Sequence, residues 1–133
     1  MNVTARATVE PMTSPDDPRG PVLEPIGPDD FASQRNAHLV LTGPGMIRGN
    51  HFHPLGTEVA LVLGPALVRL RDADGLRDVV VEPGRAVRFV FPAGVPHAML
   101  NTGDAPMIIL SFNTEAHDPA RPDVVRTVLI ETA

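Results

Sequence analysis

The sequence predicts an all-β protein whose single domain is a sandwich or barrel, and three observations support this prediction. Short apolar runs rich in β-branched residues recur between clusters of Gly, Pro, Asn and Asp. Glycine (11 residues) and proline (15 residues) supply the tight turns that such strands need. No window of useful length shows the periodicity of an amphipathic helix. The runs expected to form strands are 22–26, 37–42, 57–64, 66–72, 78–82, 86–91, 97–102, 107–112 and 123–131.

The chain length of 133 residues fits one domain with one core. Residues 1–21 contain four prolines and scattered acidic residues, so we expect a flexible N-terminal arm or an edge strand there. Residues 22–133 form the predicted barrel domain. The segment 28–34 allows one helical turn at most, with Asp29 or Asp30 as its cap.

The composition excludes several classes of function. The chain has no cysteine, so it has no disulfides or thiolate metal sites, and the absence of lysine and tyrosine removes Schiff-base catalysis and a phenolic acid. A net charge of −5 without a basic stripe argues against nucleic-acid partners. No run approaches the length of a membrane span, and the first twenty residues have no apolar signal-peptide core. We therefore expect a cytoplasmic protein that binds a small molecule.

The faces of the predicted strands differ in polarity. In 66–72, three apolar residues alternate with Arg69 and Arg71, which predicts one face in contact with water. The runs 57–64 and 107–112 instead have apolar residues on both faces. We expect a second subunit to cover these strands, which predicts a homodimer.

Four side chains from separate strands form a candidate metal site. His51 and His53 point to the same face of a strand, because residues i and i+2 do so. Glu58 opens the next strand after a short turn, and a hairpin brings it back beside the histidines. His97 begins a later strand. Each histidine alone would be read as a core or loop residue, but the four together favour a metal.

Imidazole nitrogens with one carboxylate suit a divalent transition metal ion such as zinc, nickel, iron, manganese or cobalt. Such a ligand set leaves coordination positions for water or substrate, so catalysis is possible. The residue types do not identify the metal.

Residues 45–101 resemble the two motifs of the cupin superfamily, whose fold is a double-stranded β-helix or jelly-roll barrel. The first motif corresponds to Gly45, His51, His53, Glu58 and Gly64, and the second to Gly84, Pro92, Gly94, His97 and Asn101. Gly64 lies one residue early, and the gap from Gly84 to Pro92 is longer than usual. Both departures fit changes in loop length and affect none of the four ligands.

Three phrases resemble cupins of bacterial carbohydrate biosynthesis, especially the C-terminal cupin of bifunctional capsular-polysaccharide enzymes. They are RGNHFH (48–53), LNTGD (100–104) and FNTEAHDPARPDVV (112–125). This group is similar to the epimerases that act beside the ketone of a nucleotide-linked 4-keto sugar. The related sugar ketoisomerases share the first phrase but lack the complete metal set found here.

The resemblance leaves the proton-transfer group open. A metal can stabilise the oxyanion that forms when a proton beside a ketone is removed. The epimerases that lack a metal use a histidine base and a tyrosine acid, and this chain has no tyrosine. The candidates that remain are a metal-bound water or hydroxide, Glu58, and His38 if its strand faces inward.

Other residues have weaker assignments. Arg48 is a candidate clamp for a sugar diphosphate or else a solvated turn residue, and Met99 continues the inner face of the His97 strand as a substrate contact. Glu115 and His117 are expected at a surface turn, although a position at the rim of a pocket is possible. Asn101 is expected to fix the loop behind His97.

The sequence supports three functions. The first is an isomerase or epimerase of an activated keto sugar. The second is a metal or small-molecule binding cupin without catalysis. The third is an iron or nickel dioxygenase, which uses the same ligand set. The fold itself does not choose between them.

Overall fold

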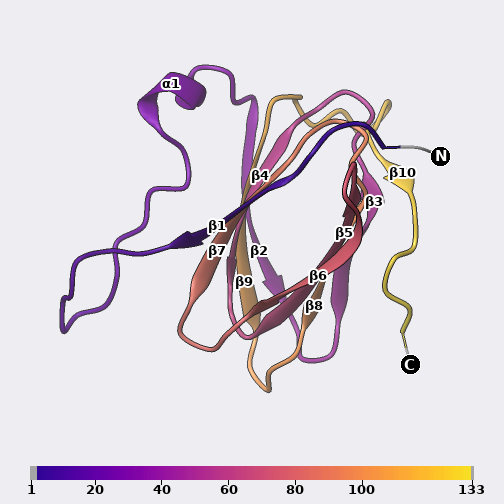
Figure 1. Ribbon diagram of the computed structural model, residues 1–133. Coiled ribbons are helices and arrows are strands. Elements are labelled where there is room, and N and C mark those ends of the chain that lie inside the picture. The colour runs from indigo at the N-terminus through magenta and orange to yellow at the C-terminus, as the bar shows by residue number, and fades with distance from the viewer. Residues whose placement is uncertain (1–2, 133) are drawn as a thin grey trace.

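The computed structural model describes residues 3–132, and these form two antiparallel five-stranded sheets that face one another (Figure 1). One sheet has the strand order β1-β7-β4-β9-β2, and the other has the order β10-β3-β8-β5-β6. The predicted all-β fold with one small domain is confirmed. The strands are β1 (Thr8–Met12), β2 (Asn36–Thr42), β3 (Ile47–Phe52), β4 (Glu58–Leu63), β5 (Ala66–Asp72), β6 (Gly75–Val81), β7 (Ala86–Phe91), β8 (His97–Asn101), β9 (Met107–Asn113) and β10 (Val125–Arg126).

Two expected strands and one expected cap are wrong. Residues 22–26 form no strand, and of 123–131 only Val125–Arg126 pairs with a neighbour, because the residues that follow bond to a side chain of β3 instead. The helix α1 (Pro28–Phe31) has Gly27 at its N-cap and no side-chain cap. Asp29 and Asp30 lie in its first turn, where carboxylates interact favourably with the helix dipole.

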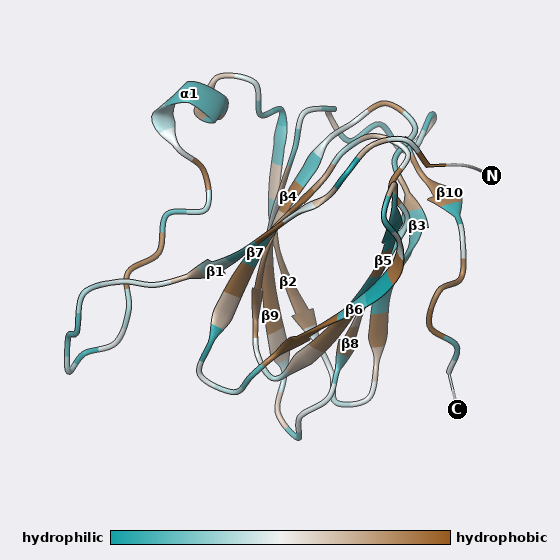
Figure 2. Ribbon diagram, viewed as in Figure 1, coloured by the Kyte–Doolittle hydropathy of each residue, from teal (hydrophilic) through white to brown (hydrophobic). Residues whose placement is uncertain are grey.

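The core lies between the two sheets and is built from alternating residues. In β5, Ala66, Val68 and Leu70 are buried while Arg71 is exposed, as the sequence pattern predicts. From the opposite sheet, Phe89 and Phe91 contribute stacked rings with centroids 5.5 Å apart. Figure 2 shows strongly apolar stretches on β4, β7 and β9 in one sheet and on β8 in the other.

The N-terminal segment links the two sheets. Strand β1 pairs with β7 at the edge of one sheet. Just before it, the N–H of Ala7 donates to Asp72 Oδ2 (2.9 Å), and Ala5 O accepts from the N–H of Ala73 (2.9 Å). Both partners belong to the β5–β6 hairpin of the other sheet. The segment therefore ties the sheets together on the side where it crosses.

The outer faces of β4 and β9 are buried to different extents. Val59 and Leu61 on β4 are only 5% and 4% exposed within the single chain. The expectation that a second subunit is needed to cover the run 57–64 is therefore wrong. The face formed by β2 and β9 is open instead, with Leu39 63%, Leu41 58% and Ile108 37% exposed.

Candidate metal centre

The four candidate ligands meet between the two sheets. His51 lies in β3, His53 follows that strand directly, Glu58 is the first residue of β4, and His97 is the first residue of β8. One nitrogen or oxygen atom of each side chain lies within 4.8 Å of those of the other three. Glu58 and His97 are buried, and the other two are half-buried. The structure thus brings together all four residues that the sequence singled out.

A bulge in β3 aims two side chains at the same cavity. The register between β3 and β8 shifts between Gly49 and His51, and Asn50 is the extra residue, with a φ of 57°. In a regular strand, Arg48 would share its face with Asn50 and Phe52. Because of the bulge, Arg48 and His51 line one cavity.

The C-terminal tail fixes this bulge. The side-chain oxygen of Asn50 accepts hydrogen bonds from the N–H groups of Leu129 (2.9 Å) and Ile130 (3.1 Å). Its amide nitrogen donates to Ile130 O (2.9 Å), and its backbone oxygen accepts from the N–H of Thr127 (2.8 Å). Residues far apart in the sequence therefore hold the backbone next to His51.

Backbone carbonyls orient two of the imidazoles. Nδ1 of His53 lies 2.8 Å from Asp123 O, and Nδ1 of His97 lies 3.0 Å from Val95 O. A carbonyl can only accept, so each Nδ1 carries the hydrogen and each Nε2 keeps its lone pair when the ring is neutral. Phe91 stacks on the ring of His97 at 4.0 Å with planes 4° apart. Both Nε2 atoms are thereby turned toward Glu58.

The centre of the cluster is rich in acceptors. Oε1 of Glu58 lies 2.9 Å from Nε2 of His53 and 3.1 Å from Nε2 of His97. Oε2 of Glu58 accepts a hydrogen bond from the hydroxyl of Ser111 (3.0 Å). Two imidazole lone pairs directed at a carboxylate oxygen are stable only with a cation between them, which is either a proton or a metal ion.

The electrostatics agree with this requirement. Burial, aided by the nearby His97 and His53, lowers the pKa of His51 to about 4. Burial opposes charge on His53 too, but the hydrogen bond to Glu58 and its negative charge outweigh it and raise the pKa of His53. Burial would raise the pKa of Glu58, but the neighbouring histidines hold it well below its usual range. A carboxylate that stays ionised and imidazoles with free Nε2 atoms fit a divalent cation.

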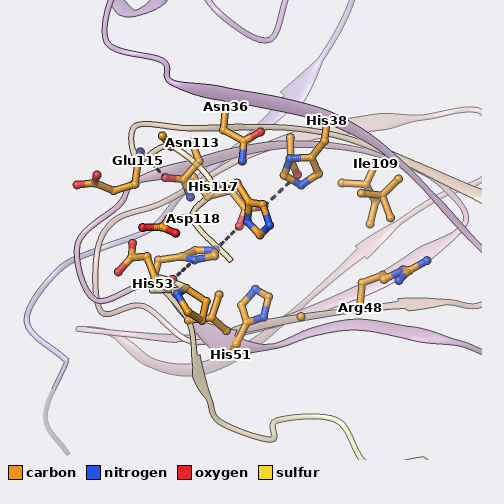
Figure 3. Close-up of a pocket in the computed structure, with 18 of the residues that line it drawn as sticks. Asn36, His38, Arg48, His51, His53, Ile109, Asn113, Glu115, His117 and Asp118 are labelled. Atoms are coloured by element: carbon orange, nitrogen blue, oxygen red, sulfur yellow. Dashed lines mark hydrogen bonds and ion pairs between the residues drawn. The ribbon is translucent and has the colours of Figure 1, made fainter. Parts of the chain in front are cut away.

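The cluster opens onto a cavity of about 290 Å³. Figure 3 shows Asn36, His38 and Ile109 on one wall, with Arg48, His51 and His53 on the facing wall. The first wall belongs to β2 and β9, and the second wall belongs to β3 and the residue after it. The cavity therefore lies between β2 and β9 of one sheet and β3 of the other.

The structure places the other candidate site residues as follows. His38 lines the cavity, and Met99 lines it while being 4% exposed. The guanidinium of Arg48 donates to Thr42 Oγ1 (3.1 Å) and to Leu41 O (3.0 Å), both at the end of β2. Arg48 therefore links β3 of one sheet to the end of β2 in the other, and two of its donors are not available to a ligand.

Asn101 lies behind the site and holds a turn. Its amide nitrogen donates to Thr42 O (3.0 Å) and Ala105 O (2.7 Å), while its side-chain oxygen accepts from the N–H of Gly103 (2.9 Å). These bonds keep the β8–β9 turn closed at the far end of the strand that begins with His97.

Several lining residues were missed by the sequence argument or assigned to a pocket only as an alternative. Glu115 and His117 are exposed, as expected, and they also line the cavity, which was the alternative for them. Ser111 and Asn113 line it too, and their alternation with Ile109 along β9 is a signal that could have revealed them. Asp123 had no such signal, because its role depends on a contact between distant parts of the chain.

Among residues 3–132, no helix combines the length and apolar character that a membrane crossing requires.

Comparison with known proteins supports this description. The family model described as polysaccharide biosynthesis C-terminal domain matches residues 15–125. Germin-like protein 2-4 of Oryza sativa subsp. japonica is 37% identical over 93 residues, which are 68% of this chain and 38% of that protein.

Solved structures share the fold. The capsular polysaccharide assembling protein CapF from Staphylococcus aureus is 25% identical with a TM-score of 0.64, over 72% of this chain and 27% of CapF. The 3,4-ketoisomerase QdtA from Thermoanaerobacterium thermosaccharolyticum is 18% identical with a TM-score of 0.70, over 91% and 87%. The rmlC epimerase of Mycobacterium tuberculosis is 18% identical with a TM-score of 0.70, over 91% and 71%.

The chain thus spans well under half of the germin-like protein and of CapF. The family model, in contrast, covers most of the chain, and the two-sheet architecture and the matched solved structures agree on the fold. On these grounds the chain belongs to the polysaccharide biosynthesis C-terminal domain family and has a cupin fold.

Proposed function

We propose that the chain is a metal-dependent cupin that transfers a proton at the carbon beside the ketone of a nucleotide-linked sugar, as an epimerase or isomerase. The observation that carries the proposal is the group of three histidines and one glutamate that opens onto a cavity of about 290 Å³. That volume is at the lower end of the range for ligand pockets, roughly 300–1,000 Å³. It suits a single sugar ring, with the nucleotide outside the mouth.

His51, His53, Glu58 and His97 would hold one divalent transition metal ion. Such an ion would supply Lewis acidity toward a ketone oxygen. Met99 and the stem of Arg48 line the cavity where they can contact the sugar.

His38 can exchange a proton with the substrate. Its direct cross-strand neighbour is Ser111, whose hydroxyl bonds to Glu58. The side chain of Ser111 therefore connects the position next to His38 with Glu58 of the candidate metal centre.

The descriptions of the similar proteins support the proposal that the substrate is a sugar. CapF is described as assembling capsular polysaccharide, QdtA as a sugar 3,4-ketoisomerase, and the mycobacterial protein as an epimerase. The last two are too distant in sequence to indicate more than the fold, and the chain covers only a part of CapF. The substrate and the reaction of this chain are therefore proposals.

One observation favours a second candidate, a cupin that binds a metal and a small molecule without catalysis. Among the described residues that line the cavity, Arg48 is the sole arginine, and its donors to Thr42 and Leu41 are occupied. Glu115 and Asp118 add negative charge. This arrangement is poor for binding a diphosphate and suits a neutral ligand better.

A homodimer forms part of the proposal. The residues that β2 and β9 direct outward are all apolar, namely Ala37, Leu39, Leu41, Ile108, Leu110 and Phe112. A two-fold axis would place this face against the same face of a second copy. A cytoplasmic location also belongs to the proposal, since nucleotide-linked sugars are made from cytoplasmic nucleotides.

The experiment begins with elemental analysis of metal-replete protein and continues with NMR in D₂O. Deuterium should enter at the carbon beside the ketone of at least one member of a panel of nucleoside-diphosphate 4-keto sugars. Metal-stripped protein and the Glu58→Gln variant serve as controls. If no member of the panel exchanges, the catalytic proposal fails, and ligand-induced changes in melting temperature then decide whether the binding function takes its place.

A further inference from the structure

We propose that His38 and His117 are a pair of proton-transfer residues that act from two sides of the cavity, so that the chain inverts a carbon centre by a two-base mechanism. The inference rests on the proposed function and specifies it, because two bases imply epimerisation.

The first argument is that three of the four candidate ligands, His53, Glu58 and His97, are already engaged in hydrogen bonds. All the hydrogen bonds that histidine rings make among residues 3–132 belong to His53 and His97. Glu58 is held by both of these rings and by Ser111, and it is 6% exposed. A buried carboxylate held at both oxygens has no freedom to carry a proton between solvent and a substrate carbon.

The second argument is that His38 and His117 have the opposite properties. Both rings are exposed, both line the cavity, and neither has a hydrogen-bond partner within the described part of the chain. An imidazole ring can give or take a proton, and histidine is the side chain that most often does so in general acid–base catalysis. Contact with water lets each ring reset its proton after a turnover.

The third argument is the position of the two rings. His38 projects from β2, which lies at the edge of one sheet. His117 lies on residues 114–123, which we call the strap. The strap leads from β9 in that sheet to β10 in the other, so it crosses the mouth of the cavity. Figure 3 shows His117 among the residues that line the cavity together with His38 and His51.

The strap is fixed at both of its ends. At its start, Thr114 N–H donates to Thr57 O (3.2 Å), and Thr114 Oγ1 accepts from the N–H of Thr57 (3.0 Å). At its end, the carboxylate of Asp123 accepts from the N–H groups of Leu55 (2.9 Å) and Gly56 (2.7 Å). His117 is therefore carried by a segment with anchored ends, which is a suitable platform for a group that must meet a substrate.

The proposed step balances in protons and charge. One imidazole takes the proton from the carbon beside the ketone, so a C–H bond breaks and an N–H bond forms. The other imidazole, already protonated, delivers its proton to the opposite side of the same carbon. Both rings then return to their starting states by exchange with water, and no oxidant or reductant is required.

The experiment compares His38→Asn and His117→Asn with the wild type in D₂O, using the nucleoside-diphosphate 4-keto sugars and following both epimers by NMR. We expect each variant to form the inverted epimer about 10²–10⁴-fold more slowly. Each should still exchange the proton of the epimer that its remaining histidine faces. The two variants should therefore retain exchange with opposite epimers.

Further readouts separate this role from a structural one. Metal content and melting temperature should equal those of the wild type, because neither histidine belongs to the ligand group. Arg121→Gln on the strap and Arg35→Gln just before β2 are matched controls, because neither residue lines the cavity, and both should react like the wild type. In wild-type protein, ring resonances of His38 and His117 should shift when the sugar binds.

The possible results are distinct. If the wild type epimerises and either variant inverts the carbon within threefold of it, the two-base inference is overturned while the proposed function stands. Loss of exchange with the same epimer in both variants also overturns it. If the wild type exchanges no sugar of the panel, the proposed function and this inference fail together.

Discussion

The variant Asp123→Asn tests whether the strap positions the metal centre. The carboxylate of Asp123 accepts from Leu55 N–H (2.9 Å) and Gly56 N–H (2.7 Å), and its backbone oxygen lies 2.8 Å from Nδ1 of His53. Asparagine keeps the shape of the side chain. It removes the charge, however, and replaces one accepting oxygen by an NH₂ group that cannot accept a hydrogen bond.

The size of the effect follows from the exposure of the two donors. Leu55 is 72% exposed, so water can replace the lost partner of its N–H group. Gly56 is buried, so its N–H group would lose a bond to a charged acceptor, which contributes about 1.5–3 kcal/mol. If that loss is transmitted to His53, the metal affinity should fall about 10- to 100-fold, since about 1.4 kcal/mol corresponds to tenfold.

The measurement is competition for the metal with a chromophoric chelator, together with thermal melting in the presence and absence of metal. Asp104→Asn is the matched control, because Asp104 is exposed in the β8–β9 turn and makes no hydrogen bond through its side chain among the described residues. If Asp123→Asn binds the metal within threefold of both the wild type and this control, the strap does not position His53.

Further predictions address the ligands, the pH dependence and the assembly. His51→Ala and His53→Ala should each lose most of the bound metal while the fold survives in melting experiments, and full retention of metal would remove that residue from the ligand group. Because the pKa of His53 is raised, metal affinity should fall as the pH drops through that pKa. At His51, whose pKa is lowered to about 4, protons should compete with the metal only near that pH. The metal-free protein should instead lose stability as the pH rises through the same pKa, because protonated His53 stabilises the folded state by pairing with Glu58; melting curves with the same pH dependence in both forms would contradict this. Light scattering should show a dimer at micromolar concentration and a monomer for the double variant Leu39→Glu and Leu41→Glu, whereas a monomeric wild type would refute the proposed interface.

The parts of the site that the sequence predicted depend on short-range geometry. His51 and His53 are two residues apart, and Glu58 follows after one short turn, so all three were visible within one window of sequence. The expected hairpin between them is wrong, however, because β3 and β4 lie in opposite sheets. The turn carries the chain from one sheet to the other, and Glu58 therefore meets the histidines across the space between the sheets. His97 was expected at the start of a later strand, and the resemblance to the second cupin motif supported its place among the ligands. The strand runs around the core were predictable for the same reason, because alternation in β5 is visible within seven residues.

The parts that the sequence did not predict depend on contacts between distant residues. Asp123 contacts Leu55 and Gly56, which lie more than sixty residues away in the sequence. The run 22–26 has the composition of a strand, but no strand forms there. Within this run, the backbone oxygen of Pro25 accepts a hydrogen bond from the side chain of Arg88 (Nε, 2.6 Å) and not from a neighbouring strand. A window of sequence shows what a segment can pair with, but it does not show which pairing wins.

The order of residues from Arg48 to His51 can be explained by the bulge that they form. Gly49 has a φ of 82°, and a Cβ there would lie 2.7 Å from His97 O, so a larger residue would push β3 away from the start of β8. Asn50 adopts the left-handed conformation that asparagine tolerates, and its amide is tied to the C-terminal tail. The glycine thus permits the close approach of the two strands, and the asparagine fixes the extra residue. This single irregularity brings two candidate ligands on neighbouring strands, His51 and His97, opposite one another, which a regular strand could not achieve while also keeping Arg48 at the cavity.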